Sequence, residues 1–271
     1  KDGEAILSLA EFLDGVSTVI VDEVHQAKAE VLKNLLTRNL KNAPIRWGLT
    51  GTIPKEKFEF ESIHASLGPV IGEISAKELQ DKGVLSQCHV NIVQLIDTVV
   101  HRGYQEELKY LVTNQGRLEY LGKLLNTVKE SGNTLILVDR ISAGEMLQEL
   151  IPGSVFVKGD VKLKDRKDAY DEINEGTNHV VIATYGVAAV GINIPRIFNL
   201  VLIEPGKSFV RVIQSIGRGI RKAEDKDSVQ IWDITSSCKF AKRHLGARKK
   251  FYKEANYPYN IEKINYENPY T

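Results

Sequence analysis

The stretch Thr18-Val19-Ile20-Val21-Asp22-Glu23-Val24-His25 begins with four residues typical of a strand and ends with two carboxylates and an imidazole. A continuous apolar run predicts a strand buried on both faces, as in parallel sheets covered by helices. Open α/β sheets bind ligands at the carboxyl ends of such strands. In phosphoryl transfer to water, one carboxylate there can hold Mg²⁺ through its waters while the next polarises the attacking water. Alternatively, Asp22 and Glu23 cap and charge the start of the following helix.

The rest of the chain alternates between strand-like runs and amphipathic helical segments. Strand-like runs occupy residues 45–49, 89–96, 134–138, 155–157, 180–183, 199–203 and 228–233. This alternation indicates an α/β fold with parallel sheets flanked by helices. Crowded charges at 55–61 and a capping box at Ser75-Ala76-Lys77-Glu78 place a boundary near residue 80, between domains of residues 1–80 and 81–271. We expect residues 228–233 to close the second sheet and the chain beyond Tyr257 to be irregular.

The composition is that of an ordinary globular protein. Of 271 residues, 42% are hydrophobic and 26% charged, and the formal net charge is +1, so nucleic-acid contact requires a local basic patch. Cys88 and Cys238 lie far apart without zinc-ligand spacing, which predicts free thiols in a reducing compartment. No run of 18 apolar residues and no leader occur, so we expect a cytoplasmic protein without a membrane partner, in the host cell if its source is viral. Because the chain starts at Lys1 rather than Met, we expect a fragment.

The segment Gln214-Ser215-Ile216-Gly217-Arg218-Gly219-Ile220-Arg221 has the pattern Q-x-x-G-R-x-x-R. On a helix its two arginines, three residues apart, share one face. Guanidinium groups fork onto phosphate oxygens and keep their charge, which suits them to stabilising the negative charge that develops in phosphoryl transfer. The alternative is a surface helix with two solvated arginines.

Two further segments with hydroxyl groups follow strand-like runs. Thr50-Gly51-Thr52 can relay hydrogen bonds between a phosphate site and a moving partner, although the tripeptide also suits a plain turn. The segment from Thr184 to Pro195 offers hydroxyl and backbone N–H groups that can hold a phosphate of a nucleic-acid backbone or a nucleotide sugar. A plain strand-to-helix loop is the alternative for that segment.

Residues 239–253 combine basic and aromatic side chains without an acidic one. The basic residues are Lys239, Lys242, Arg243, Arg248, Lys249, Lys250 and Lys253. With Phe240, Phe251 and Tyr252 between them, such a face can follow a phosphate backbone and stack on bases. Equally, the segment is a solvated helix that docks its Phe and Tyr side chains onto the domain.

Four of these segments together resemble the motifs of a known family. They stand in the order and rough spacing of motifs II, III, V and VI of superfamily 2 helicases: Asp22-Glu23-Val24-His25, Thr50-Gly51-Thr52, 184–195 and 214–221. The chain resembles the DExH-box helicases of this superfamily, and within them the UvsW-type recombination DNA helicases of T-even-like bacteriophages. The narrower likeness is carried by Tyr185-Gly186-Val187, 213–221 and Ile231-Trp232-Asp233.

The resemblance implies a RecA-like P-loop NTPase fold and a role for each motif. Residues 1–80 would be the carboxyl-terminal half of a first lobe, with motifs II and III, and residues 81–271 a complete second lobe, with motifs IV to VI and a basic tail. Asp22 would position Mg²⁺, Glu23 would be the general base, and His25 would pair across the cleft with Gln214. Arg218 and Arg221 would contact the γ-phosphate of ATP.

The remaining implied roles concern coupling and nucleic acid. Thr50, Gly51 and Thr52 would couple hydrolysis to movement, and Gly191 and Asn193 would lie near the nucleotide and the interdomain cleft. The candidate nucleic-acid contacts are Arg140, Lys158, Thr184, Tyr185, Lys249 and Lys250. Asn193 stands where many relatives have an acidic residue, which puts a carboxylate contact to the ribose or to a motif VI arginine in question.

The sequence lacks one motif of the family pattern. No Gly-Lys-Ser/Thr phosphate-binding loop occurs, and in this family that motif I lies upstream of motif II. We therefore expect the carboxyl-terminal part of an ATP-dependent DNA helicase or translocase that uses ATP and Mg²⁺ and acts on branched or single-stranded DNA. By itself, without the amino-terminal half, it would be inactive. The alternatives are an RNA helicase and a nucleic-acid-binding or annealing module without catalysis.

Overall fold

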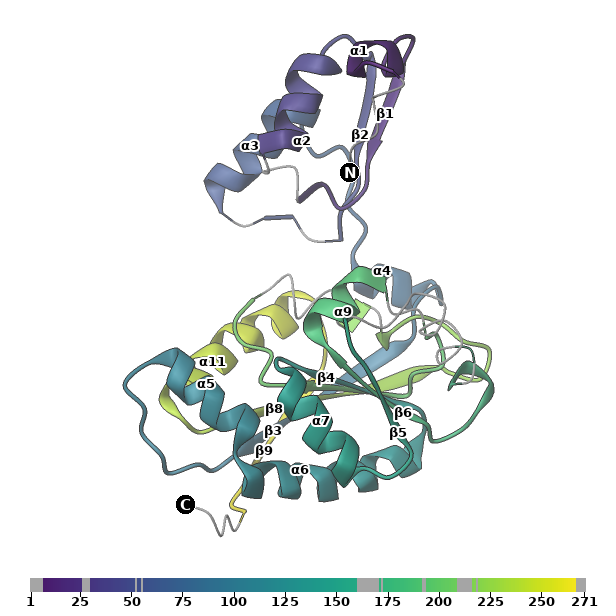
Figure 1. Ribbon diagram of the computed structural model, residues 1–271. Helices are drawn as coiled ribbons and strands as arrows, with labels where there is room; N and C mark the ends of the chain where they lie inside the picture. Colours follow the sequence, from purple (N-terminus) through teal and green to yellow (C-terminus); the bar gives the residue numbers. More distant parts are fainter. Residues whose placement is uncertain are drawn as a thin grey trace. The chain divides into compact units, whose positions relative to one another are not determined.

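The computed structural model describes residues 7–25, 30–51, 53–54, 56–159, 171, 173–191, 194–208, 216–217 and 219–266. The chain forms two compact units, Lys1–Glu73 and Ile74–Thr271, and each is described by itself. Figure 1 labels the helices and strands of both units. Within the described part of the chain, no helix is long and apolar enough to cross a membrane.

The first unit pairs two parallel strands and packs helices on one of their faces. Its described elements are α1 (Leu9–Phe12), β1 (Thr18–Val21), α2 (Glu30–Asn34), the π-helix η2 (Leu35–Asn39), β2 (Ile45–Gly48) and α3 (Lys57–Leu67). The strands run in register from Thr18 opposite Ile45 to Val21 opposite Gly48. A Cβ at Gly48 would lie 3.0 Å from Leu67 Cδ1, so glycine allows α3 to approach the strand closely.

The opposite face of β1 and β2 remains exposed, which corrects the expectation of a strand buried on both faces. Val19 and Val21 point toward the small core around Leu36, whereas Ile20 is 65% and Trp47 53% exposed. Side chains alternate between the two faces of a strand, so covering one face hides every second residue only. The apolar run correctly predicted the strand, and the described elements cover only its helix-packed face.

The second unit contains a seven-stranded sheet in which all pairings are parallel. The strand order is β5-β6-β4-β7-β8-β3-β9. Its described elements are α4 (Ala76–Asp81), β3 (Gln87–Leu95), α5 (Tyr104–Thr113), α6 (Gln115–Val128), η3 (Lys129–Ser131), β4 (Thr134–Val138), α7 (Ile141–Leu150), β5 (Ser154–Val157), β6 (Val180–Thr184), α9 (Tyr185–Gly191), β7 (Asn199–Ile203), β8 (Ser228–Ser236), α11 (Lys239–Glu254) and β9 (Tyr259–Ile264).

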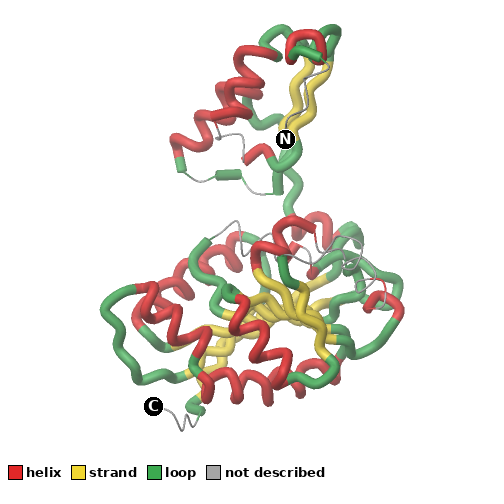
Figure 2. Tube along the Cα trace, in the orientation of Figure 1, coloured by secondary structure: helices red, strands yellow, loops and turns green. Residues whose placement is uncertain are grey.

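Helices cover both faces of this sheet, as the yellow sheet between red helices in Figure 2 shows. Helices α5, α6 and α7 pack on one face with Ile136 and Val138, and α9 and α11 pack on the other with Leu135 and Leu137. Because β4 is buried throughout, its sequence reads as a continuous apolar run. The predicted α/β class with parallel sheets flanked by helices is confirmed.

Two expectations about the end of the chain are wrong. β8 extends to Ser236 and lies between β7 and β3, so it does not close the sheet. The chain beyond Tyr257 is not all irregular, because β9 pairs with β3 from Val90 opposite Tyr259 to Leu95 opposite Ile264. An edge strand is solvated and its sequence is correspondingly polar, so its pattern lacks the apolar run that marks a central strand.

Cys88 and Cys238 are buried free thiols, as the sequence predicts. Burial raises the pKa of both thiols, that of Cys88 to about 11. Neither is therefore activated as a thiolate nucleophile.

Candidate functional site

The carboxyl ends of β1 and β2 bring the DExH and Thr-Gly-Thr segments together. Backbone pairing continues past the strands, since Leu49 N–H donates to Val21 O at 2.8 Å and Val24 N–H to Leu49 O at 2.9 Å. His25 Nδ1 lies 3.0 Å from Thr50 Oγ1 and 3.3 Å from Glu23 Oε2. One imidazole nitrogen thus contacts both segments, which are 25 residues apart in the sequence.

The two carboxylates of this cluster differ in their surroundings. Asp22 is exposed, and its Oδ1 accepts the Glu23 backbone N–H at 2.8 Å. Glu23 has a φ of 50°, the left-handed region that a side chain rarely adopts, and its side chain is 44% exposed. Its Oε2 atom is buried beside His25, while the side chain as a whole stays part-exposed. Glu23 therefore has a carboxylate that is oriented by His25 and still reaches solvent.

Magnesium fits this edge through one carboxylate, because Mg²⁺ keeps several waters and needs only one or two carboxylates besides substrate phosphates. Asp22 meets that requirement with an exposed carboxylate beside Glu23. Among the residues that the structure describes, no group of three or more His, Cys, Asp or Glu side chains could hold a metal by itself.

The carboxyl edge of the second sheet carries several predicted nucleic-acid contacts. Arg140 follows β4 and is half-buried, and Lys158 follows β5 and pairs with Glu145. Thr184 ends β6, and its Oγ1 accepts the Val187 N–H at 3.4 Å, so it caps the start of α9. Tyr185 is buried, and its hydroxyl donates to Ile203 O at 3.1 Å. Its ring thus packs in the core in the described structure.

The Q-x-x-G-R-x-x-R segment is described only in part. Gln214 and Arg218 lie outside the described residues, as do Thr52 and Asn193, and Gly191 is described only as the last residue of α9. Ile216 and Ile220 are buried one helical turn apart, with the Ile220 N–H donating to Ile216 O at 3.0 Å. Arg221 is half-buried, and its backbone forms an antiparallel bridge with Leu85.

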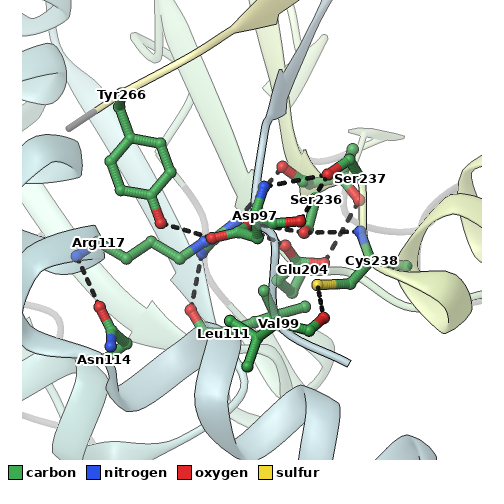
Figure 3. Close-up of polar contacts among 12 residues, drawn as sticks. Asp97, Val99, Leu111, Asn114, Arg117, Glu204, Ser236, Ser237, Cys238 and Tyr266 are labelled. Atoms are coloured by element: carbon green, nitrogen blue, oxygen red, sulfur yellow. Dashed lines mark hydrogen bonds and ion pairs between the residues drawn. The ribbon is translucent and has the colours of Figure 1, made fainter. Parts of the chain in front are cut away.

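Sequence reasoning missed a cluster of buried charges at the carboxyl ends of β3, β7 and β8. Arg117 on α6 is fully buried, and its Nη2 donates to Glu204 Oε1 at 2.8 Å. Its Nε lies 3.6 Å from Asp97 Oδ2, and Asp97 accepts hydrogen bonds from Tyr266 and Ser236 (Figure 3). An acidic residue directly after an apolar strand was the available signal for Glu204, whereas an arginine within a helix is normally read as solvated.

Burial governs the protonation of Glu204. Loss of solvent raises its pKa to about 7, although the neighbouring guanidinium of Arg117 acts in the opposite direction. Thr235 Oγ1 donates to Glu204 Oε2 at 3.4 Å, so each carboxylate oxygen has a protein donor. This cluster ties α6 to three strands, and its charges face one another rather than solvent.

Helix α11 has an exposed basic side and a buried side that packs against the domain. Lys239, Lys242, Arg243, Lys250 and Lys253 are exposed, and Lys249 is half-buried. On the buried side, Arg248 forks onto Asp233 with distances of 2.8 and 2.9 Å, and Tyr252 donates to the same carboxylate at 2.7 Å. Arg248 therefore serves packing, and the other basic side chains can meet a ligand.

Comparison with known proteins agrees with this geometry. Residues 116–223 match the helicase conserved C-terminal domain. The chain is 23% identical over 252 residues to the ATP-dependent DNA helicase uvsW of Enterobacteria phage T4, covering 89% of this chain and 50% of that protein. It is 26% identical over 249 residues to putative helicase 22 of Sulfolobus islandicus filamentous virus, covering 83% and 44%. The chain thus spans about half the length of these curated relatives.

The crystal structure of T4 UvsW superimposes with a TM-score of 0.58 at 20% identity, covering 94% of this chain and 55% of that one. The parallel sheet, its two helical layers and the domain match define the second unit as a RecA-like helicase C-terminal domain. Residues 116–223 thus match a helicase domain and the chain is similar to helicases over most of its length, so the helicase resemblance predicted from its four motifs is confirmed.

Proposed function

We propose that the intact protein is an ATP-dependent DNA helicase or translocase that acts on branched DNA, and that this chain supplies the residues after its phosphate-binding loop. The observation that carries the proposal is the contact of His25 with both Glu23 and Thr50 at the carboxyl edge of β1 and β2. In a chain similar to helicases, these groups would supply the metal-holding carboxylate and the base that ATP hydrolysis uses.

Each side chain of the cluster has a role in this proposal. Asp22 would hold Mg²⁺ through its waters, and such a metal would supply positive charge against the phosphate oxygens. Glu23 would accept a proton from the attacking water on its part-exposed carboxylate, whose Oε2 lies beside His25. Arg218 and Arg221 stabilise the charge that develops on the γ-phosphate. These three roles all concern charge that develops in the transition state.

His25 connects hydrolysis to movement in the same proposal. Its Nδ1 lies within reach of the Glu23 carboxylate and the Thr50 hydroxyl, so a change at Glu23 reaches the Thr50-Gly51-Thr52 segment through a single ring. The DNA itself would contact Arg140, Lys158 and Thr184 at the sheet edge, together with Lys249 and Lys250 of α11. The basic side of α11 also favours a second candidate, a nucleic-acid-binding module that needs no hydrolysis.

The test is ATPase activity of the full-length protein with branched DNA, single-stranded DNA and RNA in parallel. We expect branched DNA to stimulate turnover most. Stimulation by RNA alone would indicate an RNA helicase, and binding without any stimulated turnover would support the module without catalysis.

A variant sharpens the same experiment. Glu23→Gln should abolish turnover and leave ATP bound, because it removes the base and keeps the phosphate contacts. Glu30→Gln, on the exposed first turn of α2, is the matched control and should behave as the wild type. Normal turnover in Glu23→Gln would remove Glu23 from the mechanism.

A further inference from the structure

The turn before β8 contains a buried lysine. Lys226 is 1% exposed, and its ammonium donates to Pro195 O at 2.7 Å and Gly219 O at 2.8 Å. Burial lowers the pKa of this amine to about 8, although Asp225 acts in the opposite direction. A buried charge costs several kcal/mol of solvation, and an apolar side chain of similar length would avoid that cost. What the ammonium adds is two directed hydrogen bonds to the backbone.

A second contact from the same turn reaches the same place. Asp225 Oδ2 lies 2.7 Å from Nη2 of Arg196, the residue after Pro195, and Arg196 Nη1 donates to Asn174 O and Gly176 O at 2.7 and 2.9 Å. The Arg196 guanidinium lowers the pKa of Asp225. A bridge between Ala223 and Lys226 closes the turn. Residues 223–226 thus hold residues 195–196 through one buried and one surface contact.

The two carbonyls that Lys226 contacts belong to different candidate motifs. Pro195 ends the 184–195 segment, which resembles motif V, and Gly219 lies in motif VI, two residues before Arg221. The backbone around Gly219 is tightly packed, since a Cβ there would lie 3.0 Å from Leu200 Cδ2 of β7. The next carbonyl, of Ile220, accepts the Ser86 N–H at 2.9 Å. The carboxyl end of motif VI is therefore held from several sides.

We propose that Lys226 is a positioning residue that fixes the carboxyl end of motif VI, and with it Arg221, relative to the turn that ends motif V. The inference rests on the proposed ATPase function of these motifs. Lys226 acts through the backbone of Gly219 and Pro195, and not on the phosphate. An arginine that stabilises a transition state depends on its placement, because a displacement of about 1 Å can cost roughly 10²-fold in rate.

The experiment compares Lys226→Met with Lys222→Met in the full-length protein. Methionine preserves the unbranched shape and most of the length of the side chain and removes its donors. Lys222 lies on the exposed side of the same segment, where it pairs with Asp227. We expect kcat for ATP to fall about 10- to 100-fold in Lys226→Met while KM for ATP and DNA affinity stay within about threefold. Lys222→Met should match the wild type in all three.

A second readout does not need ATP hydrolysis. Backbone hydrogen exchange should accelerate in Lys226→Met both at 194–197 and at 219–221, and in Lys222→Met at neither. If Lys226→Met does not fold, Lys226→Gln replaces it with a shorter, neutral donor at the same position, and the same two segments should then exchange faster together.

The outcomes separate this inference from the proposed function. Absence of nucleic-acid-stimulated ATPase activity in the wild-type protein would refute the proposed function. The hydrogen-exchange measurement would still test whether Lys226 links residues 194–197 to residues 219–221. Unchanged kcat in folded Lys226→Met, a parallel loss of kcat and ATP affinity, or faster exchange in only one segment would overturn the positioning role.

Discussion

Each unit places a glutamate just beyond the carboxyl end of a parallel strand, Glu23 after β1 and Glu204 after β7, and the two have opposite surroundings. Both have a left-handed backbone, with φ of 50° and 44°. The Glu23 side chain is 44% exposed, and the Glu204 side chain is 6% exposed and paired with Arg117. Such a backbone costs of order 1–3 kcal/mol, so in both units surrounding contacts must hold the carboxylate at the edge.

The difference between the two glutamates lies in their access to solvent. Both oxygens of Glu204 accept hydrogen bonds inside the protein, whereas Glu23 keeps a part-exposed carboxylate whose Oε2 lies 3.3 Å from His25 Nδ1. A carboxylate enclosed by protein donors stabilises a fold, and one that reaches solvent can meet a water molecule. The same position relative to a strand thus supports structure in one unit and the proposed chemistry in the other.

The largest expected effect tests Arg221, the residue proposed to contact the γ-phosphate. In the full-length protein, Arg221→Ala should lower kcat for ATP by about 10³- to 10⁵-fold, because the arginine acts mainly in the transition state. KM and DNA affinity should change far less. Steady-state ATPase kinetics and DNA binding measure this, with exposed Lys222→Ala as the control. Weaker DNA binding with normal turnover would make the helix a reader of the phosphate backbone.

The next largest effect is on stability and concerns the buried cluster around Arg117 and Glu204. Arg117→Met should destabilise the second unit by about 3–5 kcal/mol, because it leaves the buried Glu204 and Asp97 carboxyl groups without their positively charged partner. Lys123→Met, on the exposed side of the same helix, should stay within about 0.5 kcal/mol. Denaturant unfolding measures both. Equal stability of the two variants would contradict the structural role of the cluster.

A smaller effect follows from the protonation of Glu204. Its pKa rises from an ordinary 4.5 to about 7 on folding, so the folded state keeps a proton that the unfolded state releases between these values. This contribution to stability is complete below about pH 4.5 and is lost as the pH rises through about 7. Unfolding at pH 5 and pH 8 should therefore show a fall that Glu204→Gln, which cannot titrate, makes smaller. An identical fall in both proteins would assign it to other groups.

The smallest effect concerns α11, where basic side chains face solvent and are not fixed by buried carboxylates. Each phosphate contact contributes about 0.9 to the slope of log affinity against log salt for duplex DNA. Lys249→Ala with Lys250→Ala should flatten that slope, and the exposed Lys250 should contribute more than the half-buried Lys249. Lys123→Ala, on the helix layer across the sheet, is the control. An unchanged slope would make α11 a solvated helix.

Local patterns in the sequence predicted much of the fold. Residues 134–138 and 199–203 form strands with the predicted bounds, because continuous apolar runs mark strands that are covered on both faces. The Ser75 hydroxyl accepts the Glu78 N–H, which is one of the two hydrogen bonds of the predicted capping box. The DExH and Thr-Gly-Thr segments were predicted from their chemistry and order, and their meeting at His25 follows from two neighbouring parallel strands.

By itself, the sequence determined the α/β class, the central strands and the resemblance to helicases, because periodicity, caps and motif order are local properties. Only the tertiary structure decided which strand lies at the edge, which carboxylates are engaged and what Lys226 contacts. Arg117 and Glu204 are 87 residues apart, and Lys226 and Pro195 are 31 apart. The sequence does not distinguish a buried charged residue from an exposed one of the same type, because only the packing of distant segments excludes water from the buried one.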